Sequence, residues 1–401
     1  MGAQGDRRTV LMLGNYLPSL AVARALSAAG YHVIAGDSRT WPALAASRHC
    51  DEVWVHPPIA DREPFLDALV SFLGSRRDVT TVLPVFEDHL ALLAEGRRPL
   101  PGGVVVAMPE PATVVTCLDK PAMYAVAARA QVPHLPLTMV TDHESLVAAC
   151  DHVGYPVVIR PTGRQRHPDQ GGLAWFCTTR EEVAGLHHRW QKPPGDLLVQ
   201  PYIQASVHNV YFAALSGRLL AWSESERLET DRPDGTGVNV HAVTVAPDPR
   251  MTRWTEALLE ALDYTGVGLV QFLVSANQGT YFMELNPRIG AAAALAQRVG
   301  LDLAVAACEL AMPGSTWRPD SRASERVGKR YAWTSGSLRG LVLASRRGEL
   351  TSAQALRWLA RTGLAAVRAD AHATWTVRDP GPTVAIFANW LPRRRRDGQA
   401  G

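Results

Sequence analysis

The first third of the chain alternates short apolar runs with segments of helical spacing. The apolar runs are residues 9–13, 31–35, 52–55, 81–84 and 104–107. Helical segments at residues 18–29 and 64–73 lie between some of these runs. Strands that alternate with helices at this spacing are typical of right-handed βαβ units, so the pattern predicts a parallel sheet.

The turn after the first predicted strand argues against a dinucleotide site. It reads Gly14-Asn15-Tyr16-Leu17-Pro18-Ser19, without the second and third glycines that let a backbone approach a pyrophosphate. Asp37 is only a weak match to the acidic residue that binds a ribose. We therefore expect a structural α/β domain that contributes part of a substrate surface.

The middle of the chain carries helix-start signals between short strands. Asp119-Lys120-Pro121 combines an N-cap residue with a proline in the first turn. Thr141-Asp142-His143-Glu144 reads as a capping box, and residues 178–181 form a similar cap. Strands are predicted at residues 154–161 and 197–203.

The third part of the chain has the period-two pattern of antiparallel strands. Residues 207–245 read as such strands with glycine-bearing turns, and a helix is expected at residues 251–262. Residues 266–286 form a strong hairpin pattern, with Ala276-Asn277-Gln278-Gly279 as its turn.

This hairpin brings oxygen-bearing side chains together. A four-residue loop places Gln271 opposite Glu284, and Asn286 follows on the same face because strands have a period of two. Met283 and Leu285 are then expected to face the core. One carboxylate and two amide oxygens suit a hard cation such as Mg²⁺ that also binds substrate phosphates.

Two alternatives to a metal site stay open at this point. The face can be an ordinary solvated hairpin face that happens to carry a glutamate and an asparagine. A five-residue loop would instead pair Gln271 with Met283 and separate the three side chains.

Composition and charge exclude several classes of protein. The 401 residues are 47% hydrophobic and 20% charged, which predicts roughly two to three globular units. The net charge is only +3, and part of it lies in the run Arg393–Arg396, so we expect no nucleic-acid partner. The basic run is expected to solubilise the end of the chain.

The sequence also indicates a location and excludes other chemistries. The five cysteines are scattered and lack metal-ligand spacing, which suits a reducing cytoplasm. The apolar runs are too short for a membrane span, and residues 10–13 are too short for a signal-peptide core, so we expect a cytoplasmic protein with no membrane partner. A zinc-hydrolase motif, a Gly-x-Ser-x-Gly elbow and a Walker loop are all absent from the sequence.

From Thr9 to Leu310 the chain resembles the ATP-grasp superfamily, and within it the carbamoyl-phosphate-synthetase-like and short carboxylate–amine ligase members. The pieces that carry the resemblance are Asp119-Lys120, residues 154–161, Gln200 to Ile203, residues 237–247 and Glu284-Leu285-Asn286-Pro287-Arg288. Each piece is weak alone, and their order and spacing make the signal strong.

The resemblance implies an ATP-grasp fold of the α/β and α+β classes. It comprises a parallel-sheet pre-grasp domain at residues 1–110, a small lid-bearing domain at 111–195 and an antiparallel grasp domain with the metal site at 196–320. Residues 321–401 then form a C-terminal extension and basic tail. Packing against the core is the favoured role for this extension, and shaping of the acceptor site or dimerisation are the alternatives.

The resemblance also implies roles for individual residues. Lys120 and Arg160 would bind nucleotide phosphates, although relatives usually have a lysine where Arg160 stands. Gln200 would meet the adenine amine, with backbone groups near Tyr202 and Ile203 completing the adenine edge. A first-turn lysine on the surface and a surface glutamine are the structural alternatives.

The resemblance assigns the remaining site residues as well. Gln271, Glu284 and Asn286 would hold Mg²⁺ or Mn²⁺, with Gln271 replacing the acidic ligand of many relatives. Arg288 would stabilise negative charge on an acyl phosphate and its adduct. His208 and Asn209 stand where relatives often touch ribose, but the acidic residue that relatives have there is missing.

The lid departs most from the family pattern. Residues 162–172 include two arginines and a histidine in place of a glycine-rich loop. These side chains could bind phosphates electrostatically, or they could belong to a solvated loop. The lid therefore contributes no candidate site residue.

The expected function is an ATP-dependent, amide-forming carboxylate–amine ligase that acts through an acyl phosphate. Its cofactors would be ATP and Mg²⁺ or Mn²⁺, and its partners a small-molecule carboxylate, a small-molecule amine and, as a further option, a second copy of the chain. The alternatives are carbamoyl- or carboxy-phosphate chemistry with bicarbonate, and a catalytically quiet nucleotide-binding regulatory protein.

Overall fold

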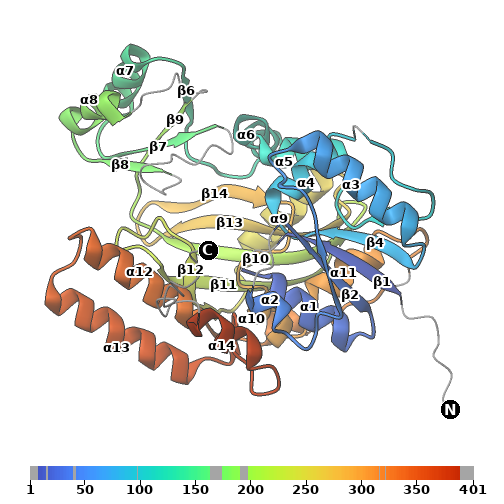
Figure 1. Cartoon of the computed structure of the whole chain (residues 1–401). Coiled ribbons are helices and arrows are strands. Elements are labelled where there is room, and N and C mark those ends of the chain that lie inside the picture. Colours follow the sequence, from blue (N-terminus) through green and yellow to red (C-terminus); the bar gives the residue numbers. More distant parts are fainter. Residues whose placement is uncertain are drawn as a thin grey trace, which may run out of the picture.

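The structure is a computed structural model that describes residues 8–14, 17–38, 42–96, 98–162, 174–189, 197–315, 317–320 and 322–388. Within these residues the chain forms three sheets, each with helices packed on it (Figure 1). The predicted lid, apart from Thr162, and the basic tail lie outside the described residues.

The first unit is a parallel sheet of five strands in the order β3-β2-β1-β4-β5. Its elements are β1 (Thr9–Leu13), α1 (Ser19–Ala28), β2 (His32–Asp37), α2 (Pro42–Ala45), β3 (Glu52–Val55), α3 (Arg62–Ser75), β4 (Val79–Pro84), α4 (Glu87–Ala94) and β5 (Val105–Val106). All five residues of β1 are buried, as expected for a central strand with helices on both faces. The predicted parallel sheet is confirmed.

The second unit is a small antiparallel sheet in the order β6-β9-β7-β8. The elements of this stretch are α5 (Pro111–Leu118), α6 (Lys120–Arg129), β6 (Thr138–Val140), α7 (His143–Val153), β7 (Val157–Pro161), β8 (Trp175–Cys177), α8 (Arg180–Arg189) and β9 (Leu197–Pro201). A separate apolar cluster that includes Leu146, Ile159 and Val199 forms its core.

The capping box of α7 lies one residue later than predicted. Asp142 is the N-cap and accepts the backbone N–H of Ser145 at 2.7 Å, while the Ser145 hydroxyl is close to the backbone N–H of Asp142. The helix therefore uses the pair Asp142 and Ser145 rather than Thr141 and Glu144, because the N-cap side chain must reach the N–H three residues later.

The third unit is a sheet of seven strands in the order β14-β13-β10-β11-β12-β15-β16. Its elements are β10 (Ser206–Leu215), β11 (Arg218–Thr230), β12 (Asn239–Thr244), α9 (Pro249–Ala261), β13 (Gly266–Ser275), β14 (Gly279–Asn286), α10 (Ala293–Arg298), α11 (Leu303–Leu310), the 3₁₀ turn η1 (Ala323–Glu325), β15 (Arg330–Ala332) and β16 (Ala371–His372). The last strand pair, β15 with β16, is parallel.

The two faces of the large sheet have different neighbours. One face packs on α6 and α9 through residues such as Phe212, Phe272 and Phe282. The opposite face packs on the helices of the first unit at one end, where Tyr211 and Leu269 join its core. The other end of this second face carries the candidate site.

Sheet membership does not follow the predicted domain limits, which stay predictions. Strand β9, which ends at Pro201, pairs with β6 and β7 of the small sheet, although it lies beyond residue 195. Helices α5 and α6 pack on β14 of the large unit, although they precede the small sheet in the chain. Strands β15 and β16 complete the large sheet, although they lie beyond residue 320 in the chain.

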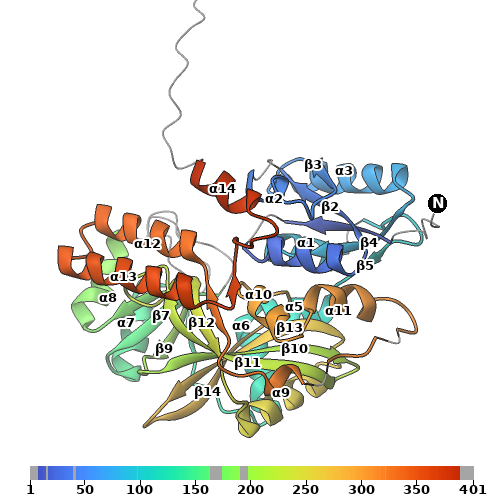
Figure 2. The ribbon, with the colours of Figure 1, turned by 90° about the horizontal axis from the view of Figure 1, so that it is seen from below.

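The C-terminal extension links the large and first units. Its helices are α12 (Thr334–Arg346), α13 (Ser352–Arg368) and α14 (Gly381–Ala388). The indole N–H of Trp358 donates to Ser337 at 2.9 Å and joins α13 to α12. Helix α14 lies against α2 of the first unit (Figure 2). The favoured role of packing against the core is confirmed. Among the described helices, none is both long enough and apolar enough to cross a membrane.

Candidate active site

The predicted pairing in the β13–β14 hairpin is present, but a bulge produces it. Gln271 pairs with Glu284, as expected. The strands meet closer to the turn than predicted, with Ser275 opposite Gly279, and this register alone would bring Met283 opposite Gln271. A register shift between Gln271 and Phe272 inserts one extra residue and restores the pairing with Glu284.

The bulge also changes which residues of β14 face the core. Phe282 and Leu285 are buried in the apolar cluster on the α6 and α9 side. Met283 is only partly buried, so the prediction that it turns to the core is wrong. The extra residue of the bulge breaks the simple alternation on which that prediction relied.

The three predicted ligands lie on one face of the hairpin, and hydrogen bonds engage both amide groups. The amide nitrogen of Asn286 donates to Glu284 Oε1 at 2.9 Å, and that of Gln271 donates to Asn209 Oδ1 at 2.6 Å. Both amide nitrogens are thereby engaged, which leaves the amide oxygens and Glu284 Oε2 to bind a ligand. Among the described residues no group of three or more His, Cys, Asp or Glu side chains is arranged to hold a metal ion, so a cation here would rely on one carboxylate and two amides.

Several cations surround this carboxylate. Burial would raise the pKa of Glu284, but Lys120, the Asn286 hydrogen bond, Arg160 and Arg288 together lower it below its usual value. Lys120 comes from the first turn of α6, where Asp119 caps the helix by accepting the Ala122 N–H at 2.9 Å. The site is therefore strongly positive around one ionised carboxylate, an arrangement that suits an anionic ligand.

Arg160 is held by a buried polar pair. Arg160 donates from Nη2 to Gln200 Oε1, and the Gln200 amide nitrogen donates to the Tyr124 hydroxyl at 3.0 Å. Gln200 is 3% exposed, so its side chain acts here as a positioning group for Arg160. Its predicted contact with adenine stays a prediction, because both ends of its amide are already engaged in this structure.

Part of the backbone that was predicted to bind the adenine edge already makes contacts within the protein. The backbone N–H of Tyr202 donates to Pro156 O at 3.0 Å, and the Tyr202 ring contacts Phe176 at 4.5 Å between centroids. Ile203 follows directly in the connector to β10. The Tyr202 N–H is thus not available as a donor in this conformation, and the predicted roles of Tyr202 and Ile203 stay predictions.

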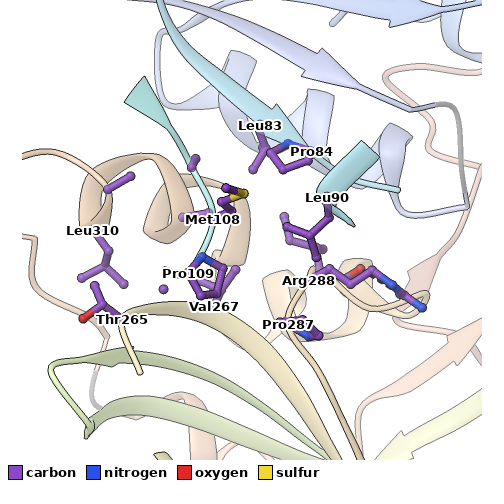
Figure 3. A pocket seen from close by; sticks show the side chains of 15 residues that line it. Leu83, Pro84, Leu90, Met108, Pro109, Thr265, Val267, Pro287, Arg288 and Leu310 are labelled. Atoms are coloured by element: carbon purple, nitrogen blue, oxygen red, sulfur yellow. Dashed lines mark hydrogen bonds between the residues drawn. The ribbon is translucent and has the colours of Figure 1, made fainter. Parts of the chain in front are cut away.

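Arg288 lies just past the end of β14 and meets the first unit. Its Nε lies 3.3 Å from Glu87 Oε2 at the start of α4. Arg288 also lines a small apolar cavity of about 30 Å³ between the first and large units, with Leu83, Met108, Pro109 and Val267 among the other lining residues. Its guanidinium is directed away from the apolar lining (Figure 3).

Sequence reasoning missed three residues of the site. Tyr124 and Glu87 position Arg160 and Arg288, and the partly buried Arg227 on β11 lies close enough to Glu284 to interact with it electrostatically. Burial lowers the pKa of Arg227, and the Glu284 carboxylate opposes this effect. The period-two alternation of side chains along β11 could have identified Arg227 from the sequence. Arg227 lies two residues after Ser225, which faces the site.

His208 and Asn209, which stand where relatives often touch ribose, point to opposite faces of the sheet. Asn209 faces the site and is bonded to Gln271. His208 faces the other way and pairs with Glu224 at 2.8 Å, away from the candidate site. Adjacent residues of a strand point to opposite faces, so only one of the two could face the site.

Two buried polar atoms in the site have no hydrogen-bond partner among the residues that the structure describes. They are the Nε of Arg160 and the hydroxyl of Ser225, which stands in the same sheet row as Asn209. Buried polar groups are rarely left unpaired in native proteins. Both atoms lie beside the cluster of cations, as expected if the site has room for a polar, anionic ligand.

The sequence is similar to known ATP-binding proteins. Residues 242–316 match the family model described as carbamoyl-phosphate synthase L chain, ATP binding domain. The chain is 25% identical over 309 residues to the carbamoyl phosphate synthase arginine-specific large chain of Lactiplantibacillus plantarum, covering 72% of this chain and 28% of that protein. The large chain from Thermotoga petrophila is 25% identical over 321 residues, covering 72% and 27%. The chain thus spans little more than a quarter of the length of these relatives.

Solved structures with a similar fold include biotin carboxylases. The biotin carboxylase domain of the Hydrogenobacter thermophilus 2-oxoglutarate carboxylase has a TM-score of 0.62 at 19% identity, covering 80% of this chain and 73% of that one. The Campylobacter jejuni biotin carboxylase has a TM-score of 0.62 at 16% identity, covering 80% and 74%. The Staphylococcus aureus N5-carboxyaminoimidazole synthetase has a TM-score of 0.58 at 12% identity, covering 78% and 79%. These likenesses establish the fold.

Proposed function

We propose that this chain belongs to the ATP-grasp superfamily and is an ATP-dependent ligase that joins a carboxylate to an amine. The observation that carries the proposal is the site around Glu284. One carboxylate and two amide oxygens stand in a row, and Lys120, Arg160, Arg227 and Arg288 surround them. This combination suits a divalent cation bound together with a polyphosphate.

The residues present fit Mg²⁺ and a nucleotide. Glu284, Asn286 and Gln271 would hold the ion, and Lys120 with Arg160 would hold the phosphates. The bound ion would supply charge neutralisation at the phosphates. The named complexes agree with this choice, since the Hydrogenobacter structure contains MgADP and ADP and the Campylobacter structure a β,γ-ATP complex.

The proposed reaction has two steps. The substrate carboxylate oxygen attacks the γ-phosphorus of ATP, the bond to the ADP oxygen breaks, and an acyl phosphate forms. The amine nitrogen then attacks the acyl carbon, phosphate leaves and the nitrogen loses a proton, which gives amide, ADP and phosphate. Lys120 and Arg160 neutralise the phosphates, and Arg288 stabilises the oxyanion of the adduct.

Glu87 and Gln200 act on this chemistry through their neighbours. Glu87 holds Arg288 at the junction of the first and large units, and Gln200 holds Arg160. Both are positioning residues rather than groups that touch the reacting atoms. Their role is to keep two cations oriented before the phosphates bind, because preorganised charge lowers the barrier more than charge that must be rearranged.

Hydroxylamine trapping tests the proposal directly. The full chain with ATP, Mg²⁺ and a panel of carboxylic acids should form a hydroxamate and release ADP with at least one acid. Glu284→Gln should remove both signals, with its melting temperature unchanged. ADP release that requires no organic acid and rises with bicarbonate would replace the proposal by the carboxy-phosphate alternative, which the bicarbonate bound to the Hydrogenobacter structure makes worth testing.

The same experiment also tests the alternative of a catalytically quiet, nucleotide-binding regulatory protein. ATP binding without ADP release across the whole panel of acids and amines would support a regulatory nucleotide-binding protein. Gln271 favours this alternative, because an amide in place of a second carboxylate weakens metal binding in the absence of phosphates.

The assembly and location of the protein are also proposals. A homodimer is supported by the Hydrogenobacter structure, which is described as a domain dimer. Light scattering on the purified chain would test this. A reducing compartment such as the cytoplasm is supported by the five free cysteines, four of which are buried. Fractionation of the producing cells would test the location.

A further inference from the structure

A second cleft lies on the face of the large sheet opposite Glu284. It has a volume of about 190 Å³ and lies between α13 and strands β11, β12 and β15. Its lining residues are Leu228, Glu229, His241, Ala242, Arg330, Tyr331, Arg361, Leu364, Ala365 and Arg368. None of these residues belongs to the candidate active site.

The alternation of the strands explains why this cleft is separate from the active site. Ala242 and Tyr331 pair with each other and join the apolar core of the face that carries Glu284. His241 and Arg330 are their neighbours in sequence, so their side chains project from the opposite face. Strand β11 therefore presents Arg227 to the active site and, after a register shift, Glu229 to the cleft.

Helix α13 supplies the other wall. Arg361, Leu364, Ala365 and Arg368 are spaced at i, i+3, i+4 and i+7, so they share one face of the helix. Two other residues of the helix, Trp358 and Thr362, attach it to α12. The helix face that lies toward β11, β12 and β15 is therefore not fully packed, and Leu364 is 50% exposed.

The charges of the cleft favour an anion. Three arginines and one glutamate line it. Glu229 is already engaged through both oxygens, by His241 at 2.7 Å and by Arg361 at 3.1 Å. Asp370 accepts the Lys329 ammonium and the backbone N–H of Arg330, and the structure gives the guanidinium groups of Arg330 and Arg368 no acidic partner among the described residues.

A buried nitrogen adds a polar group that lacks a partner. His241 is 4% exposed, its Nδ1 is bonded to Glu229, and its Nε2 has no partner among the described residues. A buried ring nitrogen without a partner is unusual in a native protein unless a ligand or water completes it. This observation is independent of the arginines and indicates a polar ligand at the inner end of the cleft.

We propose that this cleft binds a small oxyanion that carries an apolar group. Arg330 and Arg368 would bind the oxyanion, His241 Nε2 would contact a polar atom of the ligand, and Leu228 with Leu364 would cover the apolar part. A cavity of about 150 Å³ accepts a benzene-sized molecule, so the volume here suits a ring with one acidic group. A carboxylate and a phosphate ester share this chemistry. The proposal does not depend on the ligase function.

Calorimetry with benzoate and phenyl phosphate on the full chain tests the proposal. At least one probe should bind saturably, and the tighter one identifies the acidic group. Arg330→Gln combined with Arg368→Gln should weaken binding by about 100-fold or more, because the variant loses two charge-assisted contacts. Leu364→Ala should weaken both probes as well.

Two controls separate this cleft from the active site and from general charge. Arg357→Gln removes an arginine from α13 outside the cleft and should leave binding unchanged. Glu284→Gln alters the active site and should also leave it unchanged. Absence of saturable binding by both anions, equal binding of neutral benzamide, or full binding by the double arginine variant with an unchanged melting temperature would each overturn the proposal.

Discussion

Arg288 and Glu87 form an ion pair across the junction of the first and large units, with 3.3 Å between Nε and Oε2. The arginine follows the strand that carries Glu284 and Asn286, and the glutamate begins the helix after β4. The parallel sheet thus orients a cation of the candidate active site although the two residues are 201 positions apart.

Arg288→Lys should lower kcat by about 100-fold if the guanidinium stabilises an oxyanion in the transition state. Lysine keeps the charge but loses the planar fork that Arg288 presents. Steady-state kinetics of ADP release would measure the loss. Arg250→Lys, at an exposed pair with Asp248, is the matched control and should retain full activity.

Glu87→Gln should lower kcat by about tenfold with little change in KM for ATP, because it releases Arg288 without removing a phosphate contact. The split between kcat and KM distinguishes this positioning role from a nucleotide-binding role. An increase in KM alone would contradict it.

Gln200→Leu should raise KM for ATP by about tenfold. Arg160 would lose its amide partner and the Tyr124 hydroxyl would lose its donor, so the guanidinium would no longer be oriented toward the phosphates. Tyr124→Phe should have a smaller effect in the same direction. Unchanged ATP binding by Gln200→Leu would remove Gln200 from the site.

Gln271→Glu should tighten Mn²⁺ binding in the absence of nucleotide by about tenfold, because it supplies a second carboxylate beside Glu284. Calorimetry with Mn²⁺ alone gives the dissociation constant. Glu226→Gln, a change on the opposite face of the sheet, serves as the control. Equal Mn²⁺ affinity in the parent and the Gln271 variant would argue against a metal site on this hairpin.

Asp379→Asn should lower the free energy of unfolding by about 3 kcal/mol, since it breaks a buried ion pair with Arg24. Burial raises the pKa of Asp379, but Ser47, the Arg48 N–H and Arg24 outweigh it and hold the pKa below its usual value. The stabilisation is therefore complete above about pH 4 and is lost as the pH falls through the lower folded-state pKa.

Denaturant unfolding across this pH range measures that contribution. The difference between the parent and Asp379→Asn should shrink as the pH falls below about 4. Asp67→Asn, at an exposed pair with Arg98, should change stability by less than about 1 kcal/mol. A constant difference at all pH values would show that the carboxylate charge of Asp379 does not stabilise the fold.

Local patterns predicted the pairing of Gln271 with Glu284 but not its cause. Period-two alternation placed the carboxylate and the amides on one face, and the structure agrees. The turn is shorter than the sequence indicated, and a bulge compensates for it. A bulge depends on how both strands pack against their neighbours, so the residues of the hairpin alone do not reveal it.

The sequence by itself determined the order of strands and helices, the parallel first sheet, the hairpin and the residue types that suit a cation and phosphates. These properties follow from alternation, caps and turns over short distances. Only the tertiary structure decided that β9 joins the small sheet, that β15 completes the large one, and that Glu87 and Arg227 lie next to Arg288 and Glu284. Such contacts join residues far apart in the chain, and the free energy that selects them comes from packing that no local pattern encodes.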